Sequence, residues 1–204
     1  MHTFWQQCLE LLLPFSKEVR VFKDENENSI LKYYQPRWRG NHIALSRYQN
    51  PVIQALIAAN KYQTNQQAHT LLACLLQQYL NSSPDTKLVL LPMPLVLRRK
   101  HKRGYNQVEV VLEKLPSSYR KNVYKSYLRK TAFSQPQTDL KRDDRLTNVK
   151  GTFYCKSLPI QDKNTTVLII DDVLTTGATL KEAKRAVKEA VPKGTKVQTI
   201  ALAH

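Results

Sequence analysis

The chain has 204 residues, with 32 Lys and Arg against 16 Asp and Glu and a formal net charge of +16 at pH 7. This length suffices for one α/β core with a short appendage. Its apolar runs stay well short of the roughly 18 residues that a transmembrane helix needs, so we expect no membrane span.

The N-terminal region does not resemble a secretory signal. Residues 3–13 are mostly apolar but contain Glu10, and no basic segment or small-residue cleavage site flanks them, so we expect a helix docked on the domain. A polar loop over 23–29 should follow. The three cysteines, Cys8, Cys74 and Cys155, include no C-x-x-C pair that could build a zinc site. They are typical of reduced, buried thiols in a cytoplasmic protein.

The first half of the chain predicts two helices and a strand. Asn50 and Pro51 form an N-cap and first-turn pair that opens a helix to about residue 60. Apolar residues then recur at helical spacing over about 65–80. Leu88 to Leu91 predicts a strand that Pro92 ends.

The second half alternates helices and strands. We expect a helix between Tyr105 and Pro116, a strand near 123–128, a short strand at Phe153, a strand over 167–170, a helix over 180–191 and a closing strand over 196–202. This alternation predicts an α/β fold with a mainly parallel sheet flanked by helices and joined by right-handed crossovers.

The most informative segment runs from Val167 to Leu180. An apolar strand, suited to the centre of a parallel sheet, ends in Asp171 and Asp172, where ligands of such sheets bind. The carboxylates could accept hydrogen bonds from a ribose diol or hold the waters around Mg²⁺. The loop after them has short side chains that let backbone N–H groups approach a phosphate: Thr175, Thr176, Gly177, Ala178 and Thr179.

The helix that follows this loop should strengthen an anion site. Thr179 with Glu182 forms a plausible capping box, and the helix start favours negative charge. An ordinary strand that happens to end in Asp-Asp is the plain alternative. A Walker B strand is another, but the sequence contains neither G-x-x-x-x-G-K-S/T nor G-x-G-x-x-G.

The segment resembles the phosphoribosyl pyrophosphate (PRPP) motif of type I phosphoribosyltransferases, and three further blocks resemble the ComF competence family. They are the proline pair and basic loop of residues 91–107, the block of residues 129–153, and a looser match over residues 48–62. The resemblance covers about residues 43–204. It departs from the family at the N-terminus, where the four-cysteine zinc module is missing. We therefore expect an appendage over 1–41 and a phosphoribosyltransferase-like domain over 42–204.

The resemblance implies roles for particular residues. Catalytic roles fall to Asp171, Asp172 and Arg103, with Mg²⁺ held by the two aspartates through water, and the loop of residues 175–179 cradles the 5′-phosphate. The segment that faces the diphosphate contains Pro92, Met93, Pro94, Arg98, Arg99 and Lys102, and a cis bond before Pro92 or Pro94 is an open alternative. A mobile loop that closes over the site contains Thr131, Gln135, Gln137, Arg145 and Asn148.

The positive charge is concentrated next to this predicted site. Residues 98–150 contain 15 Lys or Arg and 5 Asp or Glu. A diphosphate needs only a few cations, so the remainder could follow a nucleic-acid backbone. Aromatic residues that could stack on bases lie among them: Tyr105, Tyr119, Tyr124, Tyr127 and Phe133. The alternative is a solvated basic face with these rings in the core.

Three functions remain open from the sequence. The resemblance implies a cytoplasmic ComF-like protein that binds PRPP with Mg²⁺ and handles incoming single-stranded DNA in natural transformation, with a competence helicase as a further partner to consider. A phosphoribosyltransferase of nucleotide salvage is the second, although only the strand over 196–202 follows the last helix to supply a base-reading segment. A non-catalytic nucleotide-sensing or DNA-binding adaptor is the third, and whether the protein is an enzyme stays undecided.

Overall fold

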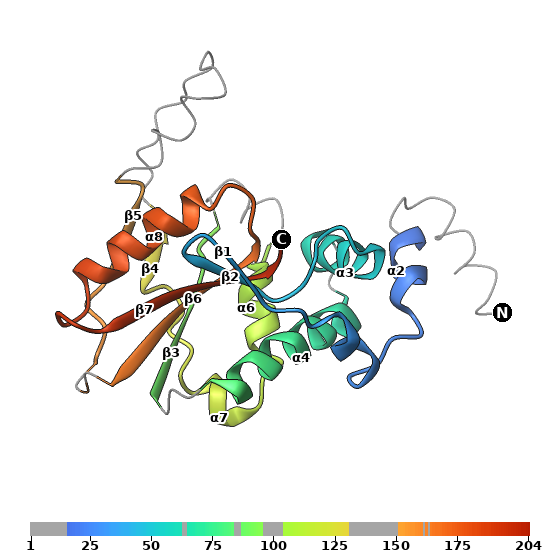
Figure 1. The fold of residues 1–204 in the computed structure, drawn as a ribbon, viewed down its shortest axis with the longest axis horizontal. Coiled ribbons are helices and arrows are strands. Elements are labelled where there is room, and N and C mark those ends of the chain that lie inside the picture. The colour runs from blue at the N-terminus through green and yellow to red at the C-terminus, as the bar shows by residue number, and fades with distance from the viewer. Residues whose placement is uncertain are drawn as a thin grey trace, which may run out of the picture.

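A five-stranded sheet forms the centre of the protein (Figure 1). The structure is a computed structural model that describes residues 16–62, 65–83, 87–95, 104–130, 151–160, 162 and 164–204. The strand order is β1 (Arg37–Arg39), β2 (His42–Ala44), β7 (Lys196–Ala203), β6 (Thr165–Val173) and β3 (Lys87–Pro92). Among the described strands of this sheet, β1 and β2 pair antiparallel and all other neighbours pair parallel, so the expected mainly parallel sheet is confirmed.

Helices cover both faces of this sheet (Figure 1). Alternate residues of β6 point to opposite faces, as a strand requires. Leu168 and Ile170 share one core with α3 (Pro51–Tyr62), α4 (Gln66–Ser82) and α6 (Gln107–Leu112). Val167 and Ile169 share the other core with α8 (Ala178–Glu189). Burial on both faces explains why the sequence of this strand is a continuous apolar run.

Smaller elements surround the two layers. The antiparallel pair β4 (Leu128–Lys130) and β5 (Phe153–Cys155) lies beside α8. The described N-terminal part contains α2 (Ser16–Phe22), which packs on α3, and a 3-10 helix over Ser29–Tyr33. A short helix, α7 (Ser117–Arg120), follows α6. None of the helices in the described ranges is long and apolar enough to cross a membrane.

The sequence located the first two long helices correctly, the first from its cap and the second from its apolar spacing. Val52 N donates to Asn50 Oδ1 at 2.9 Å, and Ala68 N donates to Asn65 Oδ1 at 2.9 Å. Each asparagine therefore satisfies one amide of the first turn that would otherwise lack a partner. The short strand at Phe153 and the closing strand from Lys196 are also confirmed.

One predicted strand was wrong. The strand expected over 123–128 is reduced to one bridge between Leu90 and Val123, because the chain turns at Ser126, which has a φ of 62°, before β4 begins at Leu128. The peptide bonds before Pro92 and Pro94 are trans. The helix expected over 3–13 lies outside the described residues. The hairpin of β1 and β2 spans the domain boundary that we expected between residues 41 and 42.

The described cysteines behave as core thiols. Cys155 is buried and Cys74 is half-buried, and neither forms a disulfide. Burial raises the pKa of both thiols to about 11. Cys8 lies outside the described residues.

Candidate functional site

Asp171 and Asp172 lie at the carboxyl end of β6, between two parallel neighbours. Asp171 pairs with Ala201 of β7, and on the other side Met93 N donates to Ile170 O at 2.8 Å. The two carboxylates therefore lie at the edge of the sheet where α/β proteins bind ligands. Lys61, the penultimate residue of α3, forms an ion pair with Asp172, with 3.1 Å between Nζ and Oδ2.

The two carboxylates differ in their surroundings. Burial and, to a smaller extent, the adjacent charge of Asp172 together raise the pKa of Asp171 to about 7. Asp172 instead has its lysine partner, and its side chain is 19% exposed. The site therefore contains one carboxyl group that resists ionisation in the free protein beside one that is paired with a cation.

The loop that joins β6 to α8 lies at the carboxyl end of the sheet. Leu174 N donates to Ala203 O at 2.8 Å, which extends the pairing with β7, and Thr175, Thr176 and Thr179 are exposed. Ala178 N donates to Thr176 Oγ1 at 3.4 Å. The hydroxyl groups and the first amides of α8 thus lie together at the end of the sheet, as a phosphate site requires.

The expected capping box was wrong. Gly177 is the N-cap of α8, and no side-chain cap bond is formed there. Glu182 instead accepts a hydrogen bond from Gly151 N at 2.6 Å and forms an ion pair with Arg185. The Glu182 carboxylate is therefore bound to Gly151 N and Arg185. The spacing of Thr179 and Glu182 in the sequence could not predict these partners.

Gly177 is also required by the packing of the loop. Its φ is 76°, and a Cβ at this position would lie 2.8 Å from both Cδ2 and Nε2 of the His42 ring. His42 is buried and its Nδ1 lies 2.7 Å from Thr199 Oγ1, so the ring is held in place. The missing side chain lets the loop pack on β2, and its role toward a phosphate stays a prediction.

The opposite wall of the site is the turn after β3. Pro92 is buried, while Met93 and Pro94 reach the cavity. Asn106 Nδ2 donates to Met93 O at 3.0 Å, and Asn106 Oδ1 accepts from Val108 N at 3.0 Å. Asn106 therefore joins the proline turn to the start of α6.

These walls enclose a cavity of about 900 Å³. It brings together the predicted residues Met93, Pro94, Asp171, Asp172, Thr175 and Thr179. The structure adds side chains that sequence reasoning did not assign to the site: Tyr48, Lys61, Asn106, Lys130, Phe153 and His204. The looser family block over residues 48–62 contained Tyr48 and Lys61, and the block over residues 129–153 contained Lys130 and Phe153.

Several predicted site residues lie outside the described residues. They are the basic residues Arg98, Arg99, Lys102 and Arg103, and the expected mobile loop with Thr131, Gln135, Gln137, Arg145 and Asn148. Their roles stay predictions.

The aromatic residues expected to stack on bases have partners within the protein. Tyr105 Oη donates to Asn60 O at 2.9 Å, and Tyr119 Oη donates to Asn81 Oδ1 at 2.8 Å. Tyr124 and Tyr127 pack edge to face, 5.3 Å apart, against the core beside α8. This arrangement favours the alternative in which the four described rings are structural.

The donor set at the end of β6 suits Mg²⁺ only together with a substrate. The described part of the chain contains no group of three or more His, Cys, Asp or Glu that could hold a metal ion. Mg²⁺ is commonly bound by one or two carboxylates, several waters and substrate phosphates. Asp171 and Asp172 satisfy the protein's share of that arrangement.

Comparison with known proteins gives one family and two relatives. The model of the phosphoribosyl transferase domain matches residues 53–204. Competence protein F of Haemophilus influenzae is 25% identical over 160 residues, which cover 76% of this chain and 69% of that protein. Competence protein ComFC of Bacillus subtilis is 33% identical over 108 residues, which cover 52% of this chain and 40% of that protein.

Proposed function

The chain belongs to the phosphoribosyl transferase domain family and is a ComF-type member of it, and we propose on that premise that its cavity binds PRPP with Mg²⁺. We further propose that it acts in natural transformation, in the handling of incoming single-stranded DNA. The observation that carries the first proposal is the convergence of two carboxylates, a threonine-rich helix start and a proline turn on one cavity.

Each part of PRPP has a chemically suited wall. The 5′-phosphate would lie at Thr175 to Thr179, where hydroxyl groups and the first amides of α8 can donate. The ribose diol would lie at Asp171 and Asp172, which can accept its hydrogen bonds. The diphosphate would lie toward Met93 and Pro94, with the basic residues 98–103 nearby in sequence.

Mg²⁺ would be held by Asp171 and Asp172, largely through water, and would supply positive charge to the diphosphate. Lys61 must share Asp172 with this ligand, so binding should replace or rearrange the ion pair between them. Lys130 also lines the cavity and adds a second cation from the described residues.

Transfer from PRPP breaks the bond between C1 of the ribose and the diphosphate and passes through a cation-like sugar. Such chemistry needs a stabilised leaving group and an acceptor held in line, and no covalent nucleophile from the protein. Tyr48 and Phe153 both line the cavity and are the aromatic side chains there that an acceptor would contact. An assay of pyrophosphate release distinguishes the two possibilities: transfer of the sugar releases pyrophosphate, and sensing of the ligand alone does not.

Calorimetric titration of PRPP, with and without Mg²⁺, tests the proposal. We expect metal-dependent binding to the wild type and its loss in the double variant Asp171→Asn/Asp172→Asn. Asp24→Asn/Asp162→Asn removes the same charge from two surface positions and should bind as the wild type does. No binding to the wild type, or equal binding by both double variants, would remove the assignment.

The competence role rests on the two relatives' names and needs a genetic test. Disrupting the gene in the organism that carries it should lower transformation frequency, and the Asp171→Asn/Asp172→Asn variant should fail to restore it. A competence helicase is the protein partner that we would seek by co-purification.

A further inference from the structure

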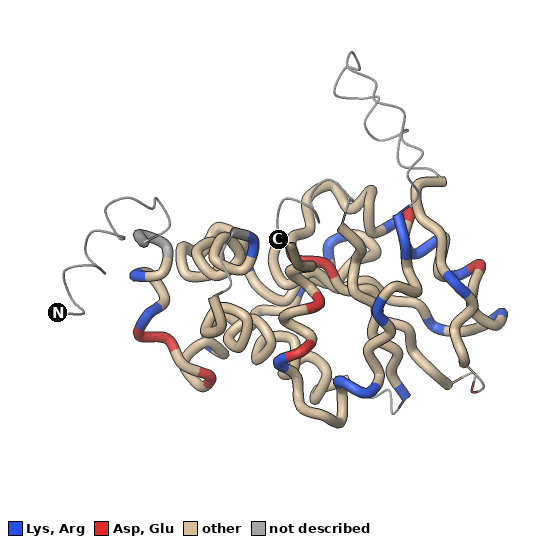
Figure 2. The backbone as a smooth tube through the Cα atoms, turned by 180° about the vertical axis from the view of Figure 1, so that it is seen from behind, with Lys and Arg blue, Asp and Glu red and all other residues tan. Residues whose placement is uncertain are grey.

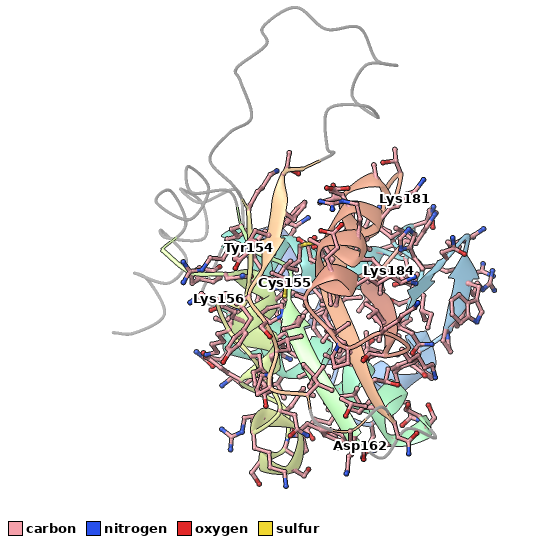
Figure 3. The ribbon with its side chains drawn as sticks, turned by 90° about the vertical axis from the view of Figure 1, so that its left-hand side faces the viewer. Tyr154, Cys155, Lys156, Asp162, Lys181 and Lys184 are labelled. Atoms are coloured by element: carbon pink, nitrogen blue, oxygen red, sulfur yellow. The ribbon has the colours of Figure 1, made fainter. Side chains whose placement is uncertain are left out.

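A second groove adjoins the PRPP cavity on the outer side of α8. It has a volume of about 830 Å³ and runs between α8 and the turn that joins β1 to β2. It shares the lining residues Leu174, Thr175 and His204 with the first cavity, so the two lie next to each other. Figure 3 shows Lys181 and Lys184 on the side of α8 that faces the hairpin, whereas Tyr154 and Lys156 lie on the other side of that helix.

Among the described residues, the lining of the groove includes five Lys or Arg side chains and no acidic residue. Arg39 lies on the hairpin side, and Lys181, Lys184, Arg185 and Lys188 lie on α8. Arg185 is neutralised by Glu182 and Glu189, which are its ion-pair partners on the same helix. Burial and the nearby charge of Lys188 lower the pKa of Lys184, as expected where like charges gather without a counter-ion.

The groove lysines differ from several other described cations in lacking an acidic partner. Figure 2 shows that the described Lys and Arg residues are spread over many elements, so net charge alone does not select a face. Elsewhere, several are paired with acids: Lys32 with Glu25, Lys87 with Asp162 and Lys125 with Glu113. The three groove lysines have no acidic partner among the described residues.

The spacing of the lysines suits an extended anion. Lys181, Lys184 and Lys188 follow at three and four residues, so they form one row along the helix. At 1.5 Å of rise per residue, the row is about 10 Å long. A single phosphate would require donors that converge on one point, whereas a row of cations matches a chain of phosphates.

We propose that this groove binds the phosphate backbone of single-stranded nucleic acid, with Lys181, Lys184 and Lys188 beside successive phosphates. The inference rests on the proposed handling of single-stranded DNA and gives it a surface. The groove is bounded by α8 on one side and by the hairpin turn on the other, which admits a single strand more readily than a flat membrane. Because the groove lies next to the PRPP cavity, a nucleic-acid strand bound in it would lie beside the phosphoribosyl site.

Trp38 marks a competing surface. It is 63% exposed and lies on the edge strand β1, where bases could stack on it. It pairs with Ile43, whose side chain belongs to the core on the α3 and α4 side. Because strand side chains alternate, Trp38 lies on the opposite face of the hairpin from Arg39, and the groove does not include it.

The test is fluorescence anisotropy of a labelled 20-residue oligo-dT, titrated with protein at several salt concentrations. The variant Lys181→Gln/Lys184→Gln/Lys188→Gln should bind about 10-fold or more weakly near 0.1 M salt. Its slope of log affinity against log salt should be about 2 smaller, since each phosphate contact on a single strand contributes about 0.7. Melting curves should match the wild type, because these side chains form no described ion pair.

A control with the same charge change is Lys114→Gln/Arg120→Gln/Lys121→Gln, near α6 and α7. It should bind the oligonucleotide with nearly wild-type affinity, and so should Trp38→Ala. If both triple variants lost the same affinity for the oligonucleotide, net charge alone would explain the effect, and the assignment of binding to the groove would be overturned. If Trp38→Ala lost affinity and the lysine variant did not, the binding surface would instead be the face of the hairpin that carries Trp38.

Two further outcomes keep the groove and the proposed function distinguishable. If the wild type binds oligo-dT and the lysine variant is unchanged in affinity and slope, only the groove is overturned. If the wild type binds anionic phospholipid vesicles but no oligonucleotide, both the groove assignment and the proposed handling of single-stranded DNA are overturned. The PRPP titration reports independently on the first cavity.

Discussion

Replacing Gly177 by Ala tests how the site loop is built. The φ of 76° costs a non-glycine residue about 1–2 kcal/mol. The added Cβ would also lie 2.8 Å from the ring of His42, and overpacking of this kind costs about 1–3 kcal/mol. We therefore expect Gly177→Ala to lower the free energy of unfolding by about 2–5 kcal/mol, measured by urea denaturation.

Gly104→Ala separates the two contributions. Gly104 has the same φ of 76°, but a Cβ there would meet no atom of the described residues within 4 Å, so only the backbone cost of about 1–2 kcal/mol should remain. In a His42→Ala background, Gly177→Ala should likewise cost only this smaller amount. The reasoning would be refuted if Gly177→Ala and Gly104→Ala cost the same, or if His42→Ala gave no relief.

Two more predictions concern the carboxylate pair. Because the pKa of Asp171 is raised from 3.8 to about 7, the folded state holds this proton more tightly than the unfolded chain, and stability should fall as pH rises between these values. Asp171→Asn should thus be more stable than the wild type at pH 8, by up to about 4 kcal/mol, and similar at pH 4; a melting curve at pH 8 below that of the wild type would contradict this. Lys61→Met should destabilise the free protein because it leaves Asp172 unpaired, and a double-mutant cycle with Asp172→Asn should give a coupling energy of about 0.5–3 kcal/mol. A coupling energy of zero would mean that the ion pair contributes nothing.

The sequence was sufficient for several features that depend on near neighbours. Asn50 and Asn65 cap their helices because cap bonds join residues two or three positions apart. The apolar run before Asp171 predicted a strand buried on both faces, since that pattern follows from local composition. The fold class and the main carboxylates of the site came from these signals and from the family blocks.

Contacts between distant segments could not be predicted in the same way. Lys61 reaches Asp172 only because α3 ends above the carboxyl edge of β6. Glu182 pairs with Gly151 N and Arg185 instead of closing a capping box, and Gly177 faces a histidine from β2. The hairpin of β1 and β2, which forms one side of the basic groove, gave no clear strand pattern in three-residue segments.

Hydrogen exchange with and without PRPP and Mg²⁺ tests most directly where the ligand binds. The account predicts slower exchange at the amides of residues 171–180, and no such change in Asp171→Asn/Asp172→Asn. Protection confined to other segments, or none at saturating PRPP, would contradict the assignment of a phosphoribosyl site to the end of β6.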